Sequence, residues 1–430
     1  MGKFQEYKNI NENYAVPGTM MAAVLSGTGY DNFKIMEIPV PKPGSNQLLA
    51  RVDATTLCVS MNKAITLGSD HSYFYGWDPV RNPLILGDEG SITLVEIGER
   101  LKGRYRIGQR YTIQPSIRCA PVNNRENYIN GGRGIERLAV GYTLGGNYTQ
   151  YILVMEEVIN NSALVPLPSQ NMPYFAVSLG EPMSTIVRAQ QMHIREYQKN
   201  PSSPRKLKTG LKEGGTTVVI GQGPMGRLHD EFALMHRIKN IIIVETDNNR
   251  LHWGKKNLDD KARKKGINTF YFNPKEVDIV SKVKEITEGK MADDVVVPVG
   301  NAKVQQDAIK LAGRGGRVNL FGGVRGSIIE VDPAFFHYNE GVIVGSTGAE
   351  AYDMELALRA ISNGDINPGS HTALVGKFQD IPQLLERAVN QEFDGKVIVY
   401  PHIDLDGPIE TEGKWNGEKE EDLFDRMLKD

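Results

Sequence analysis

Three short segments carry side chains that could hold a metal ion. Cys58 lies in "TLCVSMNKAITLGSDH", Asp88 and Glu89 are adjacent in "LGDEGSITLVEIG", and Glu181 precedes a proline in "LGEPMSTIVRA". Zn²⁺ accepts thiolate and carboxylate ligands, and three protein ligands leave a fourth position for water or substrate. Each residue alone has an ordinary interpretation, as a small core side chain or a solvated turn residue. Together they predict a catalytic zinc site.

A second set of residues predicts a dinucleotide site. The segment "TTVVIGQGPMG" runs from a β-branched strand into Gly221, Gly223 and Gly226, and a helical pattern follows. One glycine turns the chain, the next lets the backbone approach a pyrophosphate, and the third lets helix and strand pack closely. The anion would lie at the helix N-terminus, where free N–H groups favour it. Pro224 and Met225 complete this loop.

The residues after the next predicted strand, "NIIIVE", indicate which nucleotide binds. Glu245 ends this strand, about 20 residues beyond the glycine loop, where a carboxylate accepts the ribose hydroxyls. With Asp247 nearby, Glu245 would repel a 2′-phosphate, and the first basic residue after it is Arg250. We therefore expect NAD(H) as the cofactor. NADP(H) is the alternative, and Arg250 is the residue that would serve it.

These candidate sites require two different kinds of domain. From Thr19 to about Tyr151, short β-like runs are separated by Gly, Pro and Asn, which indicates a barrel-like β region. From about Gly214, apolar runs alternate with helical segments, which indicates a parallel sheet covered on both faces. Between them, "QKNPSSPRKLKTGLKEGG" predicts a surface excursion. The charged tail after Pro401 predicts a short amphipathic helix, and the fold class is α/β.

Composition narrows the classes of partner. The chain has 430 residues, enough for two or three domains, and its 50 basic and 52 acidic side chains nearly cancel. This balance gives no indication of nucleic acid or an anionic membrane as a partner. No apolar run approaches the roughly 18 residues of a membrane span, and the polar start does not resemble a signal peptide. We expect small-molecule partners and a reducing, cytoplasmic setting.

The metal-ligand segments come first in the chain and the dinucleotide-binding pattern follows them. This order resembles that of the medium-chain, zinc-dependent alcohol and polyol dehydrogenases. The resemblance covers nearly the whole chain. It implies a GroES-like β-barrel catalytic domain over residues 1–183, a Rossmann doubly wound parallel-sheet domain over 184–345, and a return to the catalytic domain over 346–430. It also implies a homodimer or homotetramer. Segments such as "GRYRIGQRYTIQPS", "GYTLGGNYTQYI" and "WNGEKEEDLF" are similar to a sugar-phosphate branch, the L-sorbose 1-phosphate reductases.

The resemblance implies a role for each residue of the metal segments. Cys58 and Glu181 correspond to zinc ligands, as in polyol dehydrogenases. Glu89 corresponds to the acidic neighbour of the metal and is close enough to join its ligands. Ser60 corresponds to the hydroxyl that passes the substrate's proton onward, and Lys63 occupies the position of the usual proton-relay histidine.

Two positions depart from the family pattern. Asp88 stands where the family has a ligand histidine. Because aspartate is shorter and negatively charged, a metal bound to it would lie nearer the loop and polarise its substrate less. Many relatives also carry four closely spaced cysteines for a structural zinc, where this chain has only Cys119. We therefore expect one zinc, held by Cys58, Asp88 and Glu181.

The implied activity is hydride transfer between NAD(P)(H) and a polyol or ketose, specifically a sugar phosphate such as L-sorbose 1-phosphate. A substrate phosphate requires cations, and the candidates are Lys63, His71 and His337, with Tyr338 as a neutral donor. Two alternatives stay open. One is a zinc-free NAD(P)H-dependent carbonyl or alkene reductase, which Asp88 supports. The other is a nucleotide-binding protein without catalytic activity.

Overall fold

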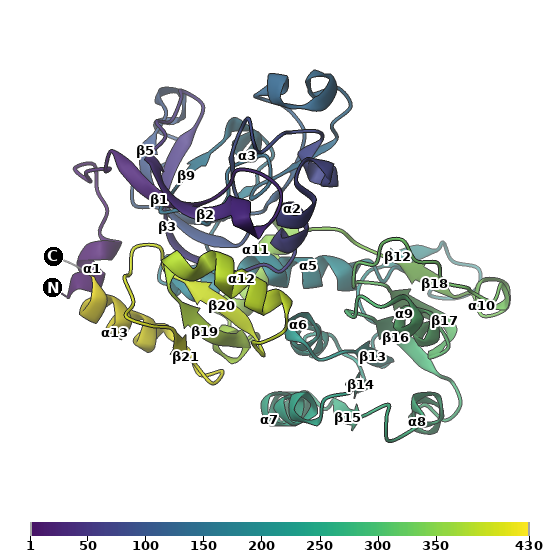
Figure 1. The fold of residues 1–430 in the computed structure, drawn as a ribbon. Coiled ribbons are helices and arrows are strands. Elements are labelled where there is room, and N and C mark those ends of the chain that lie inside the picture. The colour runs from purple at the N-terminus through teal and green to yellow at the C-terminus, as the bar shows by residue number, and fades with distance from the viewer. Residues whose placement is uncertain (1, 429–430) are drawn as a thin grey trace. The chain divides into compact units, whose positions relative to one another are not determined.

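The chain folds into two units, seen in a computed structural model that describes residues 2–428 (Figure 1). One unit combines Met1–Ser184 with Ala349–Asp430, and the other is Thr185–Gly348. The chain therefore leaves the first unit once and returns to it. Within the described residues, no helix combines the length and apolar character needed to cross a membrane.

The first unit is built mainly of antiparallel strands. Its larger sheet has the strand order β10-β6-β5-β3-β20-β19-β21, with β9 also paired to β3, and a smaller sheet has the order β2-β1-β4. Alternating apolar residues of these strands bury one continuous core. The elements are α1 (Lys3–Lys8), β1 (Thr19–Leu25), β2 (Phe33–Pro39), β3 (Leu48–Thr56), α2 (Met61–Leu67), β4 (Leu84–Ile85), β5 (Gly90–Ile97), β6 (Arg110–Ile113), β7 (Ser116–Arg118), β8 (Arg137–Ala139), β9 (Tyr151–Val154), α3 (Glu156–Asn160), β10 (Leu164–Pro166), α4 (Tyr174–Ser178), α5 (Gly180–Gln191, which continues into the second unit), α11 (Ala351–Ser362), β19 (Thr372–Gly376), α12 (Ile381–Val389), β20 (Lys396–Val399), β21 (Ile409–Glu410) and α13 (Gly417–Met427).

The second unit contains a six-stranded parallel sheet in the order β15-β14-β13-β16-β17-β18. Side chains of α6 and α7 pack on one face and those of α8 and α9 on the other, so the sheet is doubly wound, as predicted. The elements are β11 (Arg195–Tyr197), β12 (Lys206–Lys208), β13 (Thr216–Ile220), α6 (Pro224–Ala233), β14 (Asn240–Val244), α7 (Asn248–Lys264), β15 (Asn268–Phe272), α8 (Ile279–Ile286), β16 (Ala292–Val296), α9 (Ala302–Ile309), β17 (Ala312–Asn319), α10 (Ala334–His337) and β18 (Val342–Val344).

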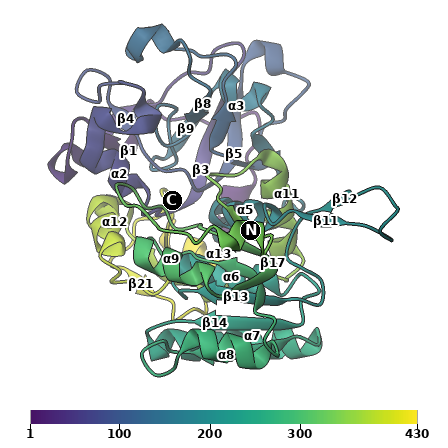
Figure 2. The ribbon, with the colours of Figure 1, turned by 90° about the vertical axis from the view of Figure 1, so that its right-hand side faces the viewer.

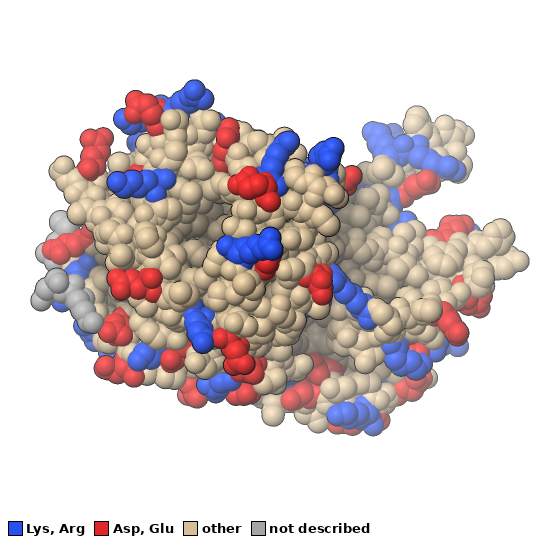
Figure 3. Space-filling model, turned by 45° about the horizontal axis from the view of Figure 1, so that its top comes forward, with Lys and Arg blue, Asp and Glu red and all other residues tan. Residues whose placement is uncertain are grey.

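The predicted surface excursion begins directly after β11 and includes β12, and these two strands form an antiparallel hairpin (Figure 2). Exposed basic residues and an exposed Leu207 occupy it, so no alternation of buried and exposed positions marks these strands in the sequence. On the face of the molecule in Figure 3, basic and acidic side chains are interspersed.

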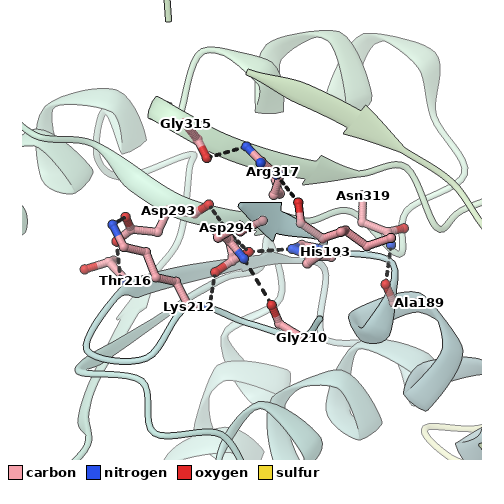
Figure 4. A network of polar contacts seen from close by, with 12 residues as sticks. Ala189, His193, Gly210, Lys212, Thr216, Asp293, Asp294, Gly315, Arg317 and Asn319 are labelled. Carbon is pink, nitrogen blue, oxygen red and sulfur yellow. Dashed lines mark hydrogen bonds and ion pairs between the residues drawn. The ribbon is translucent and has the colours of Figure 1, made fainter. Parts of the chain in front are cut away.

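A buried polar network fixes the segment that follows α5 to the sheet of the second unit (Figure 4). Asp294 of β16 is fully buried and lies 2.5 Å from His193 Nδ1, and it also pairs with Arg195. Nearby, the Asn319 amide donates to the Ala189 carbonyl at 2.8 Å. Because buried polar groups are costly without partners, these contacts hold the end of α5 in one place.

Candidate active site

The ends of two paired strands bring three of the predicted metal-site residues together. In the register of β3 and β5, Thr55 lies opposite Gly90. Cys58 follows the end of β3, whereas Asp88 and Glu89 directly precede β5. One ligand atom from each of these three side chains lies within 4.8 Å of the others. They form a site of the size that one metal ion requires.

Both carboxylate oxygens of Glu89 have partners within the protein. The Lys396 ammonium lies 2.5 Å from Glu89 Oε1, and the Thr56 hydroxyl donates to Oε2. Lys396 begins β20, which pairs with β3 beside Thr56. These contacts hold the Glu89 carboxylate in one orientation beside Cys58 and Asp88.

Asp88 is different, because its Oδ1 atom is buried and has no hydrogen-bond partner. A buried carboxylate oxygen without a partner is costly and calls for a ligand. Burial and then Glu89 raise the pKa of Asp88 to about 7. Burial and then Asp88 also raise the pKa of the Cys58 thiol. A bound dication would offset this crowding of acidic groups.

Glu181 lies in the first turn of α5, where it is 6% exposed. It is not among the three residues whose ligand atoms gather within 4.8 Å. Its carboxylate nevertheless belongs to the same electrostatic cluster, since burial and then Asp88 and Glu89 raise its pKa.

Tyr148 shapes the backbone around the cluster. Its hydroxyl accepts a hydrogen bond from the Cys58 amide at 3.0 Å. Its ring packs on Gly87, where φ is +102° and an added Cβ would lie 2.4 Å from a ring carbon. Only glycine fits both that conformation and that space. Tyr148 therefore fixes the segments on both sides of the cluster, which sequence reasoning did not identify.

Ser60 lies directly beside the cluster, at the start of α2. Its Oγ is 2.9 Å from Cys58 Sγ. Burial and then Asp88 raise the pKa of the nearby Tyr142 phenol. The Tyr142 ring stacks on His71, with ring centroids 5.2 Å apart. Lys63, on the same helix as Ser60, is exposed and has no ion-pair partner among the described residues.

The four candidates for binding a substrate phosphate differ in their surroundings. His71 is buried, and its Nδ1 accepts a hydrogen bond from the Tyr73 amide, which requires that nitrogen to be unprotonated. Lys63, in contrast, is an exposed cation. His337 and Tyr338 lie in and after α10 of the second unit, and both are exposed.

The glycine loop of the second unit has the geometry that its sequence predicts. Gly221 has φ of +101°, and an added Cβ on Gly226 would lie 1.9 Å from the Gly221 carbonyl oxygen. Gly223 caps α6, and Pro224 occupies its first turn, followed by Met225. The N–H groups at the start of α6 are therefore available to an anion.

Glu245 follows β14 at the same edge of the sheet as this loop. Its carboxylate accepts backbone N–H groups of Gln222, Thr246 and Asp247, at 2.7, 2.6 and 3.1 Å. Arg250 Nη1 lies 3.9 Å from the carboxylate. The acidic group is thus held in place beside the glycine loop, with one arginine next to it.

Lys396 is the main functional candidate that the sequence did not reveal. It occurs in "DGKVIV", an otherwise apolar strand, where a lysine is buried together with its carboxylate partner. In the sequence, the only indication of this ion pair is a charged residue within an apolar run. Its partner Glu89 lies 307 residues away, so no local pattern connects the two.

Comparison with known proteins identifies the family. Residues 224–363 match the family model described as zinc-binding dehydrogenase. Mannitol-1-phosphate 5-dehydrogenase of Aliivibrio fischeri is 30% identical over 393 residues, which cover 89% of this chain and 87% of that protein. L-sorbose 1-phosphate reductase of Klebsiella pneumoniae is 25% identical over 77% of this chain and 76% of its own length.

A solved structure shows the same fold. The model of this chain matches 2R,3R-butanediol dehydrogenase from Bacillus subtilis with a TM-score of 0.69, at 21% identity, over 89% of this chain and 99% of that chain. The prediction of a GroES-like domain combined with a Rossmann domain is confirmed. The chain therefore belongs to the family of medium-chain, zinc-binding dehydrogenases.

Proposed function

We propose that this chain is a zinc-dependent, NAD(H)-preferring oxidoreductase that interconverts a sugar-phosphate ketose and its polyol. The observation that carries the proposal is the Oδ1 atom of Asp88, which is buried without a hydrogen-bond partner beside Cys58. The Cys58 Sγ atom in turn lies 2.9 Å from Ser60 Oγ. The names of two relatives, a mannitol-1-phosphate dehydrogenase and an L-sorbose 1-phosphate reductase, support a phosphorylated substrate. L-sorbose 1-phosphate is the specific substrate proposed.

The residues present fit a zinc ion. Cys58, Asp88 and Glu181 would hold it, since they supply a thiolate and two carboxylates. Glu89 would remain beside the metal, because Lys396 and Thr56 occupy its oxygens. The pKa values of all three proposed ligands are raised, and all three must lose their protons to bind, so zinc binding would release protons and weaken as the pH falls.

When bound, zinc would polarise the ketone oxygen, and the nicotinamide would supply the hydride. The chain's own residues prepare this reaction. The Ser60 hydroxyl can donate to one group and accept from another, so it can deliver a proton to the developing alkoxide. Lys396 keeps the charge of Glu89 in a fixed position.

Binding of the nucleotide and of the substrate phosphate falls to other residues. The loop of Gly221, Gly223 and Gly226 would hold the pyrophosphate, and Glu245 would accept the adenosine ribose hydroxyls. Lys63 is the proposed contact for the substrate phosphate, because it is an exposed cation three residues after Ser60. Charge-assisted hydrogen bonds contribute about 1.5–3 kcal/mol each.

The test compares NADH oxidation with L-sorbose 1-phosphate and with free L-sorbose. Two charge-assisted hydrogen bonds predict a roughly hundredfold higher kcat/KM for the phosphate. Equal values would contradict a sugar-phosphate substrate. Removal of zinc with a chelator should abolish the activity, and added Zn²⁺ should restore it. Full activity of the zinc-free protein would instead indicate a carbonyl reductase that needs no metal.

A further inference from the structure

The C-terminal helix α13 caps another helix of the first unit. Its Glu420 side chain is 0% exposed, and its two oxygens accept the Tyr174 amide at 2.7 Å and the Phe175 amide at 2.8 Å. These are the first two residues of α4, whose amides have no partner within that helix. The Tyr400 hydroxyl also donates to Glu420 at 2.9 Å. The negatively charged carboxylate therefore lies at the N-terminus of α4, where the free amides give the helix a partial positive charge.

Contacts on several sides fix α13 in this position. The Phe424 ring is fully buried and lies 5.3 Å from Phe4 and 5.2 Å from Tyr400, between ring centroids. The Phe4 amide donates to Asp425 at 2.7 Å, so α1 and α13 lie side by side (Figure 1). The Trp415 indole donates to the Tyr400 hydroxyl at 2.8 Å. Glu420 is thus presented to α4 by a packed element and not by a mobile tail.

The capped helix leads directly to a proposed zinc ligand. The Leu179 amide bonds to the Phe175 carbonyl at 3.3 Å, and the Met183 amide bonds to the Leu179 carbonyl at 3.3 Å. These bonds continue the helical pattern from α4 into the first turn of α5, which carries Glu181. At the end of α4, the Ser178 carbonyl oxygen lies 3.4 Å from the hydroxyl of Thr56, which donates its proton to Glu89. Glu420 therefore caps a helix whose hydrogen bonds lead on into the turn that carries Glu181.

We propose that Glu420 is a positioning residue for the zinc site. From α13, it fixes the start of α4 and, through that helix, the place of Glu181 relative to Cys58 and Asp88. The inference rests on the proposed role of Glu181 as a ligand. It assigns to the C-terminal tail a function in holding the metal, beyond closing the core of the first unit.

The first experiment measures zinc release from the full-length protein to a chelator, without reference to activity. Glu420→Gln keeps the shape of the side chain but replaces one acceptor oxygen by an NH₂ group. We expect zinc release to become roughly tenfold faster, the size of effect seen when partners of metal ligands are lost. The absorption spectrum of the Co²⁺-substituted variant should change as well, because the ligand geometry shifts.

Glu157→Gln is the matched control. Glu157 is also 0% exposed and accepts one backbone amide, from Asn123 at 2.8 Å, which lies outside α4. This variant should release zinc at the wild-type rate and keep the wild-type Co²⁺ spectrum. The proposal is overturned if Glu420→Gln releases zinc as slowly as the wild type, or if Glu157→Gln accelerates release equally.

Further variants keep the result interpretable. Glu181→Ala tests the ligand role itself: if it holds zinc like the wild type, the proposed ligand set fails, and the role of Glu420 fails with it. If Glu181→Ala loses zinc while Glu420→Gln retains it, only the positioning role is wrong. Should Glu420→Gln not fold, Tyr400→Phe removes the hydroxyl that donates to Glu420 and accepts from Trp415, and Trp415→Phe, which removes only the second bond, is its control. Faster zinc release from Tyr400→Phe than from Trp415→Phe supports the proposal, and equal release contradicts it.

Discussion

The Lys396 ammonium lies 2.5 Å from a carboxylate oxygen of Glu89, and the two side chains are only 8% and 1% exposed. The adjacent carboxylate, Asp88, has an oxygen that is equally enclosed but lacks a partner. Glu89 is thus paired with a cation, whereas its neighbour Asp88 keeps one buried oxygen, Oδ1, without a hydrogen-bond partner. This difference underlies the assignment of Asp88 to the metal.

Replacing Lys396 by Met should strongly destabilise the protein, because Glu89 would remain buried without its counter-ion. Loss of one partner of a buried ion pair costs about 3–5 kcal/mol. Urea unfolding measures this loss. Lys414→Met is the control, since Lys414 forms an exposed pair with Glu412 at 2.9 Å, and such pairs contribute about 1 kcal/mol or less. A cost below about 1 kcal/mol for Lys396→Met would show that Glu89 does not depend on it.

The position of Glu245 predicts a preference for NADH. Its negative charge disfavours a 2′-phosphate, so the wild-type kcat/KM should be at least about tenfold higher for NADH than for NADPH. In Glu245→Gln this ratio should shrink, because the charge is lost while Arg250, 3.9 Å away, remains to bind the phosphate. Steady-state kinetics with both cofactors provides the test. A wild-type preference for NADPH would refute the assignment.

His402 should make the protein less stable in acid. Burial and then Arg51 lower its pKa to about 3, from the usual value near 6.5. Between these values the unfolded chain binds a proton that the folded chain does not, so stability falls as pH decreases from about 6.5. In His402→Gln, up to one fewer proton should be taken up on unfolding, so the free energy of unfolding should depend less on pH. Urea unfolding at pH 7, 6 and 5 measures it, and an unchanged slope would contradict the prediction.

Local patterns predicted much of the second unit. The strand, glycine loop, helix and Glu245 are close in the sequence, and steric requirements at Gly221 and Gly226 leave few alternatives. The partners of the metal cluster were harder to predict. Lys396 and Glu420 are each brought to their partners by long-range packing, 307 and 246 residues along the chain. The tail was predicted only as an amphipathic helix, because periodicity indicates a buried face without indicating what covers it.

Asp88→His should keep or tighten zinc binding and raise turnover, provided that the longer ring fits without moving the loop. A histidine ligand is neutral, so it lowers the negative charge around the metal and strengthens polarisation of the substrate. Zinc content and kcat of the purified variant test this. Lower zinc content and lower kcat together would indicate that the site is built for a carboxylate.

The zinc content of Asp88→Ala, determined by metal analysis of purified, folded protein, tests the central claim most directly. The wild type should contain at most one zinc per chain. Asp88→Ala should lose that zinc together with activity, because the buried oxygen that awaits a ligand is removed. If Asp88→Ala retains its full zinc and full turnover, aspartate is not a ligand and this account of the site is wrong.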